Sequence, residues 1–130
     1  MNIDNIWNQD SKQAEFIRAY LECLLWASWD DNEDPLDINY TIDEITPSAL
    51  ESSIKDCQRF MFLYERLFPD NYEQAGYDFW LTRNGHGAGF WDRPEIYGKE
   101  AATELTGACG HGTLFPEKHA FAQKNKVYVE

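Results

Sequence analysis

The sequence predicts an α+β fold, in which two amphipathic helices and a short third helix pack on a small antiparallel sheet built from hairpins. Apolar residues recur at helical spacing over residues 10–29 and again over residues 46–68. Two turn signals, Asn84-Gly85 and the run around Lys124, separate short stretches of strand-forming residues. With 130 residues, 43% of them hydrophobic and 15% aromatic, the chain is expected to form a single domain, 1–130, around one core.

The first helix is expected from about Asp10 to Trp29. Asp10 or Ser11 can cap it, because a side-chain oxygen accepts hydrogen bonds from the free amides of a first helical turn. Cys23 lies on the apolar face and is expected to be a small buried hydrophobe rather than a reactive thiol. The chain has three cysteines and no Cys-x-x-Cys pair, which favours reduced thiols.

Residues 30–44 are expected to form an acidic connector, in which no Lys or Arg interrupts the carboxylates. Charge runs are typically solvated, partly flexible segments, and the alternative is a surface that presents carboxylates to a basic groove on another protein. A calcium loop is disfavoured, because the run lacks a central glycine and has Thr41 at the twelfth position from Asp30. The acidic residues are Asp30, Asp31, Glu33, Asp34, Asp37, Asp43 and Glu44.

The second helix has the clearest start signals in the chain. Thr46 is the expected cap, Pro47 occupies the first helical position, and Pro69 follows the end of the apolar pattern. Cys57 lies on the core stripe and is expected to be buried. A short third helix is expected from about Lys99 to Thr106, and a C-terminal hairpin is expected around residues 124–126, between apolar runs at 120–122 and 127–129.

Residues 77–93 are expected to form a further hairpin. Asn84-Gly85 favours a type I′ turn, which needs positive φ at both central residues. That register places Trp80 on the same face as Gly87 and Gly89, where the ring would lie across the two glycines. The segment is interpreted either as a mainly structural hairpin or as one that also forms a binding surface.

The run Asp78-Phe79-Trp80-Leu81-Thr82-Arg83-Asn84-Gly85-His86-Gly87-Ala88-Gly89-Phe90-Trp91-Asp92-Arg93 resembles the hallmark of a family of small uncharacterised bacteriophage and prophage proteins. The order of the surrounding segments is also similar. The chain departs from the family pattern after Arg93, where Pro94-Glu95-Ile96-Tyr97 replaces a Gly-Leu-Gly-like turn. The resemblance implies a phage or mobile-element origin, and it carries no established activity.

The hairpin also contains residue types that could bind a ligand, namely Trp80, Arg83, His86, Trp91, Asp92 and Arg93. Together they would supply a base, an anion clamp and an orienting carboxylate. Catalysis is not favoured, because the chain has no catalytic-triad or phosphate-loop motif. The glycines at 85–89 lack the strand-to-helix context of a dinucleotide fingerprint.

A zinc site built from Cys109, His111 and His119, with His86 as a fourth ligand, is the other candidate constellation. The chain lacks the paired-ligand motif that makes a zinc prediction specific. We therefore expect no metal and no cofactor. A nucleophilic Cys109-His111 pair is disfavoured, because side chains two residues apart point away from each other in an extended segment.

The net charge of −12 and the pI near 4.5 argue against direct binding to nucleic acid or to an anionic membrane, because both are themselves negative. No apolar run has the length of a membrane span and the N-terminus lacks signal-peptide features, so a cytoplasmic location in a host cell is expected.

The leading hypothesis is a protein–protein interaction function rather than an enzymatic one. The protein would act as an acidic, nucleic-acid-mimicking decoy against a host protein with a basic surface, and anti-restriction or anti-CRISPR inhibition is one form of it. The alternative is a small-molecule or nucleotide-binding protein, including a hydrolytic one, that uses the hairpin. A third interpretation is an auxiliary phage protein that functions within an assembly.

Overall fold

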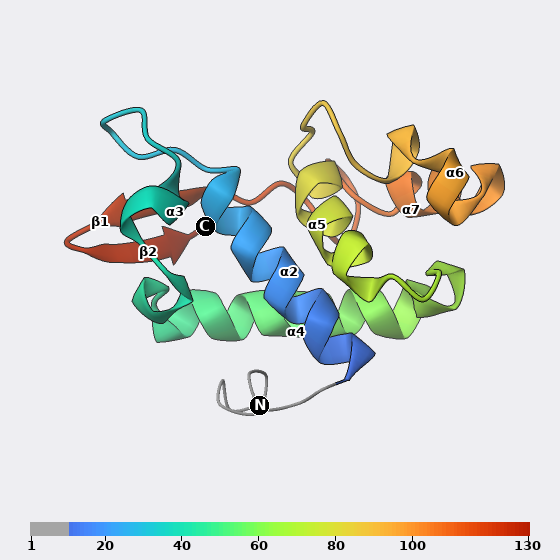
Figure 1. Ribbon diagram of the computed structural model, residues 1–130, viewed down its shortest axis with the longest axis horizontal. Coiled ribbons are helices and arrows are strands. Elements are labelled where there is room, and N and C mark those ends of the chain that lie inside the picture. The colour runs from blue at the N-terminus through green and yellow to red at the C-terminus, as the bar shows by residue number, and fades with distance from the viewer. Residues whose placement is uncertain (1–10) are drawn as a thin grey trace.

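The computed structural model describes residues 11–130, which form a mostly helical fold with one small antiparallel sheet. Figure 1 shows α4 (Pro47–Tyr64) along one side of the molecule, with α2 (Lys12–Trp26) crossing it. The β-hairpin lies towards one end of α4, and α6 (Pro94–Tyr97) and α7 (Lys99–Gly107) lie towards the other (Figure 1). The mostly helical fold with a small antiparallel sheet agrees with the α+β prediction only in outline: the sheet has two strands, and the helices pack mainly on one another rather than on a sheet built from several hairpins.

The two long amphipathic helices form where the sequence predicts them. Ser11 caps α2 by accepting a hydrogen bond from the Ala14 amide, whereas Asp10 lies outside the described residues. Thr46 caps α4 by accepting from the Ala49 amide. The α-helical geometry ends at Tyr64, and a 3-10 turn, η2 (Glu65–Leu67), completes the segment before the next helix.

The three cysteines contribute to the interior of the fold. Cys23 and Cys57 are fully buried, and burial raises the pKa of each thiol above its usual value. All three thiols are free, as expected from their number and spacing.

The prediction of a hairpin at residues 77–93 is wrong, because Tyr72–Arg83 forms a helix, α5. The Asn84-Gly85 pair ends this helix: the Gly85 amide donates to the Thr82 carbonyl and the His86 amide donates to the Leu81 carbonyl. These two bonds define the Schellman motif, which requires positive φ at its glycine, and Gly85 has φ 66°. The left-handed backbone that suits a hairpin turn therefore terminates a helix here.

The contact between α5 and α2 is the most extensive one between any two described elements. Gly76 makes this close approach possible, because a Cβ atom at that position would overlap the main-chain carbonyl oxygen of Phe16. Stacked phenylalanine rings fill the space between α5 and α4, with the centroids of Phe60 and Phe79 4.1 Å apart. The buried phenylalanines are Phe16, Phe60, Phe79, Phe90 and Phe115.

The remaining elements include both expected and unexpected ones. The C-terminal hairpin is confirmed, with β1 (Ala120–Gln123) paired to β2 (Lys126–Val129) through a turn at Lys124 and Asn125, which have φ of 52° and 64°. α7 is confirmed within one residue of its expected end. The short elements α3 (Leu36–Asn39), η1 (Ile42–Glu44), η3 (Phe90–Asp92) and α6 were not predicted.

Candidate functional site

Arg83, which was expected to face a ligand, is instead buried in the core. Its Nη1 donates to Asp56 Oδ2 at 2.8 Å and to the Tyr20 hydroxyl at 3.1 Å, and its Nε donates to the Pro116 carbonyl at 2.9 Å. Burial acts to lower the pKa of the guanidinium, but Tyr20 and Asp56 outweigh it and raise the pKa above its usual value. The side chain therefore ties α5 to α2, α4 and the segment before β1.

Asp78 forms a second buried polar centre. Its carboxylate accepts hydrogen bonds from Arg93 Nε at 2.8 Å, from the Tyr97 hydroxyl at 2.6 Å and from Gln74 Nε2 at 3.2 Å. Burial raises the pKa of Asp78, and these three donors oppose the rise. Arg93 is thus committed to an internal ion pair that fastens α6 to α5.

The turn that follows α5 is also held by its own polar atoms. The Phe90 amide donates to Thr82 Oγ1 at 3.0 Å, and the Gly89 amide donates to Asp92 Oδ1 at 3.0 Å. A Cβ atom at Gly89 would overlap Thr82 Oγ1, and Gly89 has φ 153°. Trp91, in contrast, has 54% of its surface exposed.

The six residues expected to bind a ligand therefore do not converge on one site. Arg83 and Arg93 form internal ion pairs, and Asp92 caps η3. Among the six, Trp80 and His86 line one pocket, and His86 and Arg93 line another. The partner roles of Tyr20, Asp56 and Tyr97 are not predictable from the sequence, because no local pattern relates these residues to the residues they contact.

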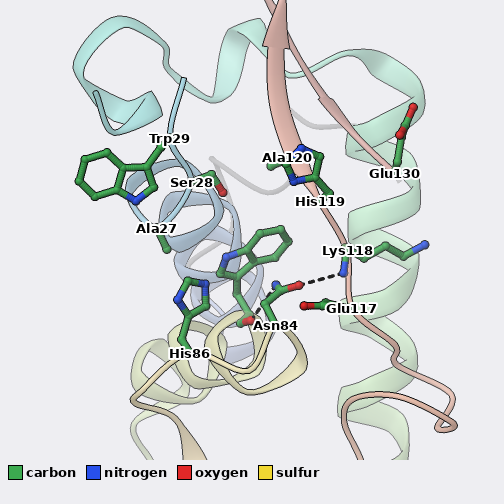
Figure 2. Close-up of a pocket in the computed structure, with 11 residues that line it drawn as sticks. Ala27, Ser28, Trp29, Asn84, His86, Glu117, Lys118, His119, Ala120 and Glu130 are labelled. Atoms are coloured by element: carbon green, nitrogen blue, oxygen red, sulfur yellow. Dashed lines mark hydrogen bonds between the residues drawn. The ribbon is translucent and has the colours of Figure 1, made fainter. Parts of the chain in front are cut away.

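The pocket that Trp80 and His86 share has a volume of about 510 Å³ and lies where the end of α2, the end of α5 and the start of β1 meet. Figure 2 shows His86 and His119 on different sides of it, with Trp29 at the rim. The Asn84 side chain donates to the Trp80 carbonyl and accepts from the Lys118 amide, so both of its polar atoms are used. The complete lining is Ala27, Ser28, Trp29, Trp80, Asn84, His86, Glu117, Lys118, His119, Ala120 and Glu130.

The zinc constellation considered from the sequence is dispersed in the structure. Cys109 donates its thiol to the Leu105 carbonyl, and burial raises its pKa to about 12. His111 is exposed on a turn, whereas His119 stacks on Phe121 with centroids 5.6 Å apart. Among residues 11–130, no three His, Cys, Asp or Glu side chains are grouped so that they could hold a metal ion.

Residues 28–44 form a folded segment, which we call the acidic hook. Asp30 Oδ1 accepts hydrogen bonds from the amides of Asn32 and Asp34, and the Leu36 amide donates to the Ser28 carbonyl. Thr41 and Glu44 form a reciprocal capping box at the start of η1. The hook is anchored by Leu36, which is fully buried. Its exposed carboxylate residues are Asp31, Glu33, Asp37 and Asp43.

A groove of about 530 Å³ lies between the hook and α2. Its walls combine carboxylates with apolar side chains, and the residues are Glu22, Leu25, Asp37, Tyr40, Thr41, Ile42 and Asp43. We call it the acidic groove. Glu22 was missed in the sequence analysis, although the signal was present: residues 19–54 contain nine of the chain's 23 carboxylates and none of its 11 Lys and Arg residues.

Comparison with protein-family models, with curated proteins and with solved structures finds no match to this chain. Over residues 11–130, none of the helices combines the length and apolar character needed to cross a membrane.

Proposed function

We propose that the protein is an acidic protein-binding module whose acidic groove and hook receive Lys and Arg side chains of a basic partner. The observation that carries this proposal is the composition of the groove. Leu25, Tyr40 and Ile42 provide apolar surface beside the carboxylates of Glu22, Asp37 and Asp43. Lys and Arg have the matching chemistry, because their aliphatic stems pack on apolar surface while their cationic heads pair with carboxylates.

Exposed apolar side chains on the hook and at the end of α2 add features of a protein interface. Trp29 and Ile38 are each 62% exposed and Trp26 is 44% exposed. Large exposed aromatic side chains are common anchors of interfaces, where they bury much surface with few rotatable bonds. The hook is held in one conformation by its own hydrogen bonds. Binding of a partner would therefore cost little further conformational entropy in this segment.

The partner we propose is a host protein that normally binds nucleic acid through a basic groove. Carboxylates spaced over a folded surface resemble the phosphates of a nucleic-acid backbone in charge, and a chain with a net charge of −12 is attracted to the same surface. Inhibition of a restriction or CRISPR complex in the host cytoplasm, by a protein of phage or mobile-element origin, is the form of this proposal that the hallmark resemblance favours.

A charge-matched pair of variants tests the proposal. The first carries Asp31→Asn, Glu33→Gln, Asp37→Asn and Asp43→Asn, and it keeps Asp30 and Glu44, whose side chains hold the hook together. The second carries Glu51→Gln, Glu73→Gln, Glu95→Gln and Glu100→Gln, which are exposed outside the hook. Both variants remove four exposed carboxylates and change the net charge equally, so the comparison tests where on the surface the carboxylates are needed.

Each tagged protein is used to capture partners from bacterial lysate at low and moderate salt, and the captured protein is then purified for binding measurements. We expect the hook variant to bind about tenfold more weakly or worse, because steering and pairing by the hook are lost. The matched variant should retain binding, and duplex DNA should compete with the wild-type protein for the partner. Equal binding by the two variants, or binding that DNA does not affect, would contradict the proposal.

A further inference from the structure

The pocket beside Trp80 has one feature that the protein-binding proposal does not use. Trp80 is 2% exposed, and its indole Nε1 has no hydrogen-bond partner within residues 11–130. A buried N–H without a partner is unfavourable relative to a bonded one. A ligand that brings an acceptor to this atom would remove that cost, so the site favours molecules with such an acceptor.

The other polar groups of the pocket limit the chemical classes of ligand that it could bind. The Asn84 side chain already donates one hydrogen bond and accepts another within the protein, which fixes its orientation. The Lys118 side chain points away from the other lining residues (Figure 2), which leaves the Ser28 hydroxyl and the imidazoles of His86 and His119 as neighbouring hydrogen-bonding groups. Glu117 and Glu130 also line the pocket, and their charge disfavours an anionic ligand.

The rim supplies a surface for a flat ring. Trp29 is 62% exposed, and its indole makes no ring contact with another aromatic side chain in the described part of the chain. Offset stacking on such an indole is favourable for planar molecules. The pocket volume of about 510 Å³ lies within the range of pockets that enclose small organic ligands.

From these groups we infer that the pocket between Trp29, Trp80 and His86 binds a small, uncharged, planar heterocycle that carries a carbonyl acceptor, the chemical class that includes nucleobases and nicotinamide. The carbonyl accepts a hydrogen bond from Trp80 Nε1, and the ring stacks on Trp29. The Nε1 atom is itself covered by protein, so binding requires a neighbouring side chain to move away from it. His86 and Trp29 are the neighbours best placed to do so, because both are exposed and neither belongs to the hydrophobic core.

The test uses the indole N–H signals of the ¹⁵N-labelled full chain in nuclear magnetic resonance spectra. Trp80→Phe identifies the Trp80 signal by its loss, and contacts to the Tyr20 ring, 5.5 Å from the Trp80 ring, identify it if that variant does not fold. Uridine and nicotinamide are the probes, with ribose as the probe without a heterocycle. Uridine monophosphate is the anionic counterpart.

We expect uridine or nicotinamide to move the Trp80 signal downfield in a saturable way, and ribose to leave it unchanged. Trp29→Ala should weaken binding about tenfold, since stacking on an aromatic ring contributes roughly 1–3 kcal/mol, whereas Trp91→Ala should leave it unchanged. A Trp80 signal that neither heterocycle moves at about 10 mM, beyond the weak end of useful affinities, would overturn the inference. So would equal binding by Trp29→Ala and wild type, or tighter binding of the monophosphate than of uridine.

Discussion

The segment 77–93 and the acidic hook use their polar residues in opposite ways. In the first, Asp78, Arg83 and Arg93 bond to partners inside the protein, and the ion pairs join α5 to α4 and α6. In the hook, Asp30 and Glu44 hold the backbone, while Asp31, Glu33, Asp37 and Asp43 are exposed. A segment rich in reactive residue types is therefore mainly architectural here, and the segment with the plainer composition presents the unpaired charges.

The difference follows from the cost of burial. An isolated buried charge is strongly unfavourable, so a charge inside the fold must be given partners. Arg83 receives three acceptors and Asp78 receives three donors. The exposed carboxylates of the hook need no partner because water solvates them, which leaves them available to another molecule.

The largest effect is expected from breaking the buried ion pair. Asp56→Ala should lower the free energy of unfolding by about 3–5 kcal/mol, because it leaves the Arg83 guanidinium buried without its carboxylate. Asp37→Ala in the hook should change it by less than about 0.5 kcal/mol, as is usual for surface substitutions. Urea denaturation measures both.

A double variant distinguishes the cost of the unpaired Arg83 charge from the cost of lost side-chain packing. Adding Arg83→Met to Asp56→Ala should recover part of the lost stability, since neither charge then remains buried. If Asp56→Ala were no more destabilising than Asp37→Ala, the ion pair would not be the anchor that its geometry indicates.

A smaller effect is expected from the close contact of α5 with α2. Gly76→Ala should destabilise the protein by about 1–3 kcal/mol, because the new methyl group overlaps the Phe16 carbonyl and forces the helices apart. In Gly107→Ala, at the end of α7, the added Cβ meets no atom within 4 Å. That variant should be neutral or more stable by up to about 1 kcal/mol. Thermal unfolding of the two variants compares them directly, and an equal response would show that space at Gly76 is not limiting.

The same contrast explains which parts of the fold the sequence could predict. Helices α2 and α4 combine apolar stripes with local caps at Ser11 and Thr46, and both signals lie within a few residues. In α5 the buried face includes Gly76, Asp78 and Arg83, so the apolar pattern that marks an amphipathic helix is lost. The polar residues there are satisfied by partners from distant segments, which local patterns do not reveal.

Part of the folded structure of the hook could be predicted from the sequence. Thr41 and Glu44 have the three-residue spacing of a capping box, and the structure forms one. Their place in a long acidic run made a solvated connector the simpler interpretation. The pocket at Trp80 was not predictable, because Ser28, Trp80 and His119 come from three separate parts of the chain. The sequence nominates Trp80 and His86 as residues for a small-molecule ligand, and His86 and His119 for a metal, but it does not relate them to Ser28 or Trp29.

Within the hook, Asp30 should matter more than its acidic neighbour. Asp30→Ala removes the acceptor for the amides of Asn32 and Asp34 and should cost about 1 kcal/mol, comparable to the loss of a helix cap. Asp31→Ala should have no measurable effect. Hydrogen exchange at the amides of residues 32–34 is the sensitive measurement. Similar exchange in both variants would mean that Asp30 does not hold the loop.

The smallest effect concerns the exposed charges of the hook. The variant with Asp31→Asn, Glu33→Gln, Asp37→Asn and Asp43→Asn should be more stable than wild type by a few tenths of a kcal/mol at low salt, because like charges repel within one segment. The gain should disappear near 1 M salt, where the screening length falls to about 3 Å. The matched variant at Glu51, Glu73, Glu95 and Glu100 should gain less, because Lys55 pairs with Glu51 and basic residues occur throughout that part of the chain. Urea titrations at the two salt concentrations distinguish these outcomes, and a loss of stability in the hook variant would contradict them. A hook whose charges lower stability is not explained by folding, so this result would strengthen the case that those charges serve binding.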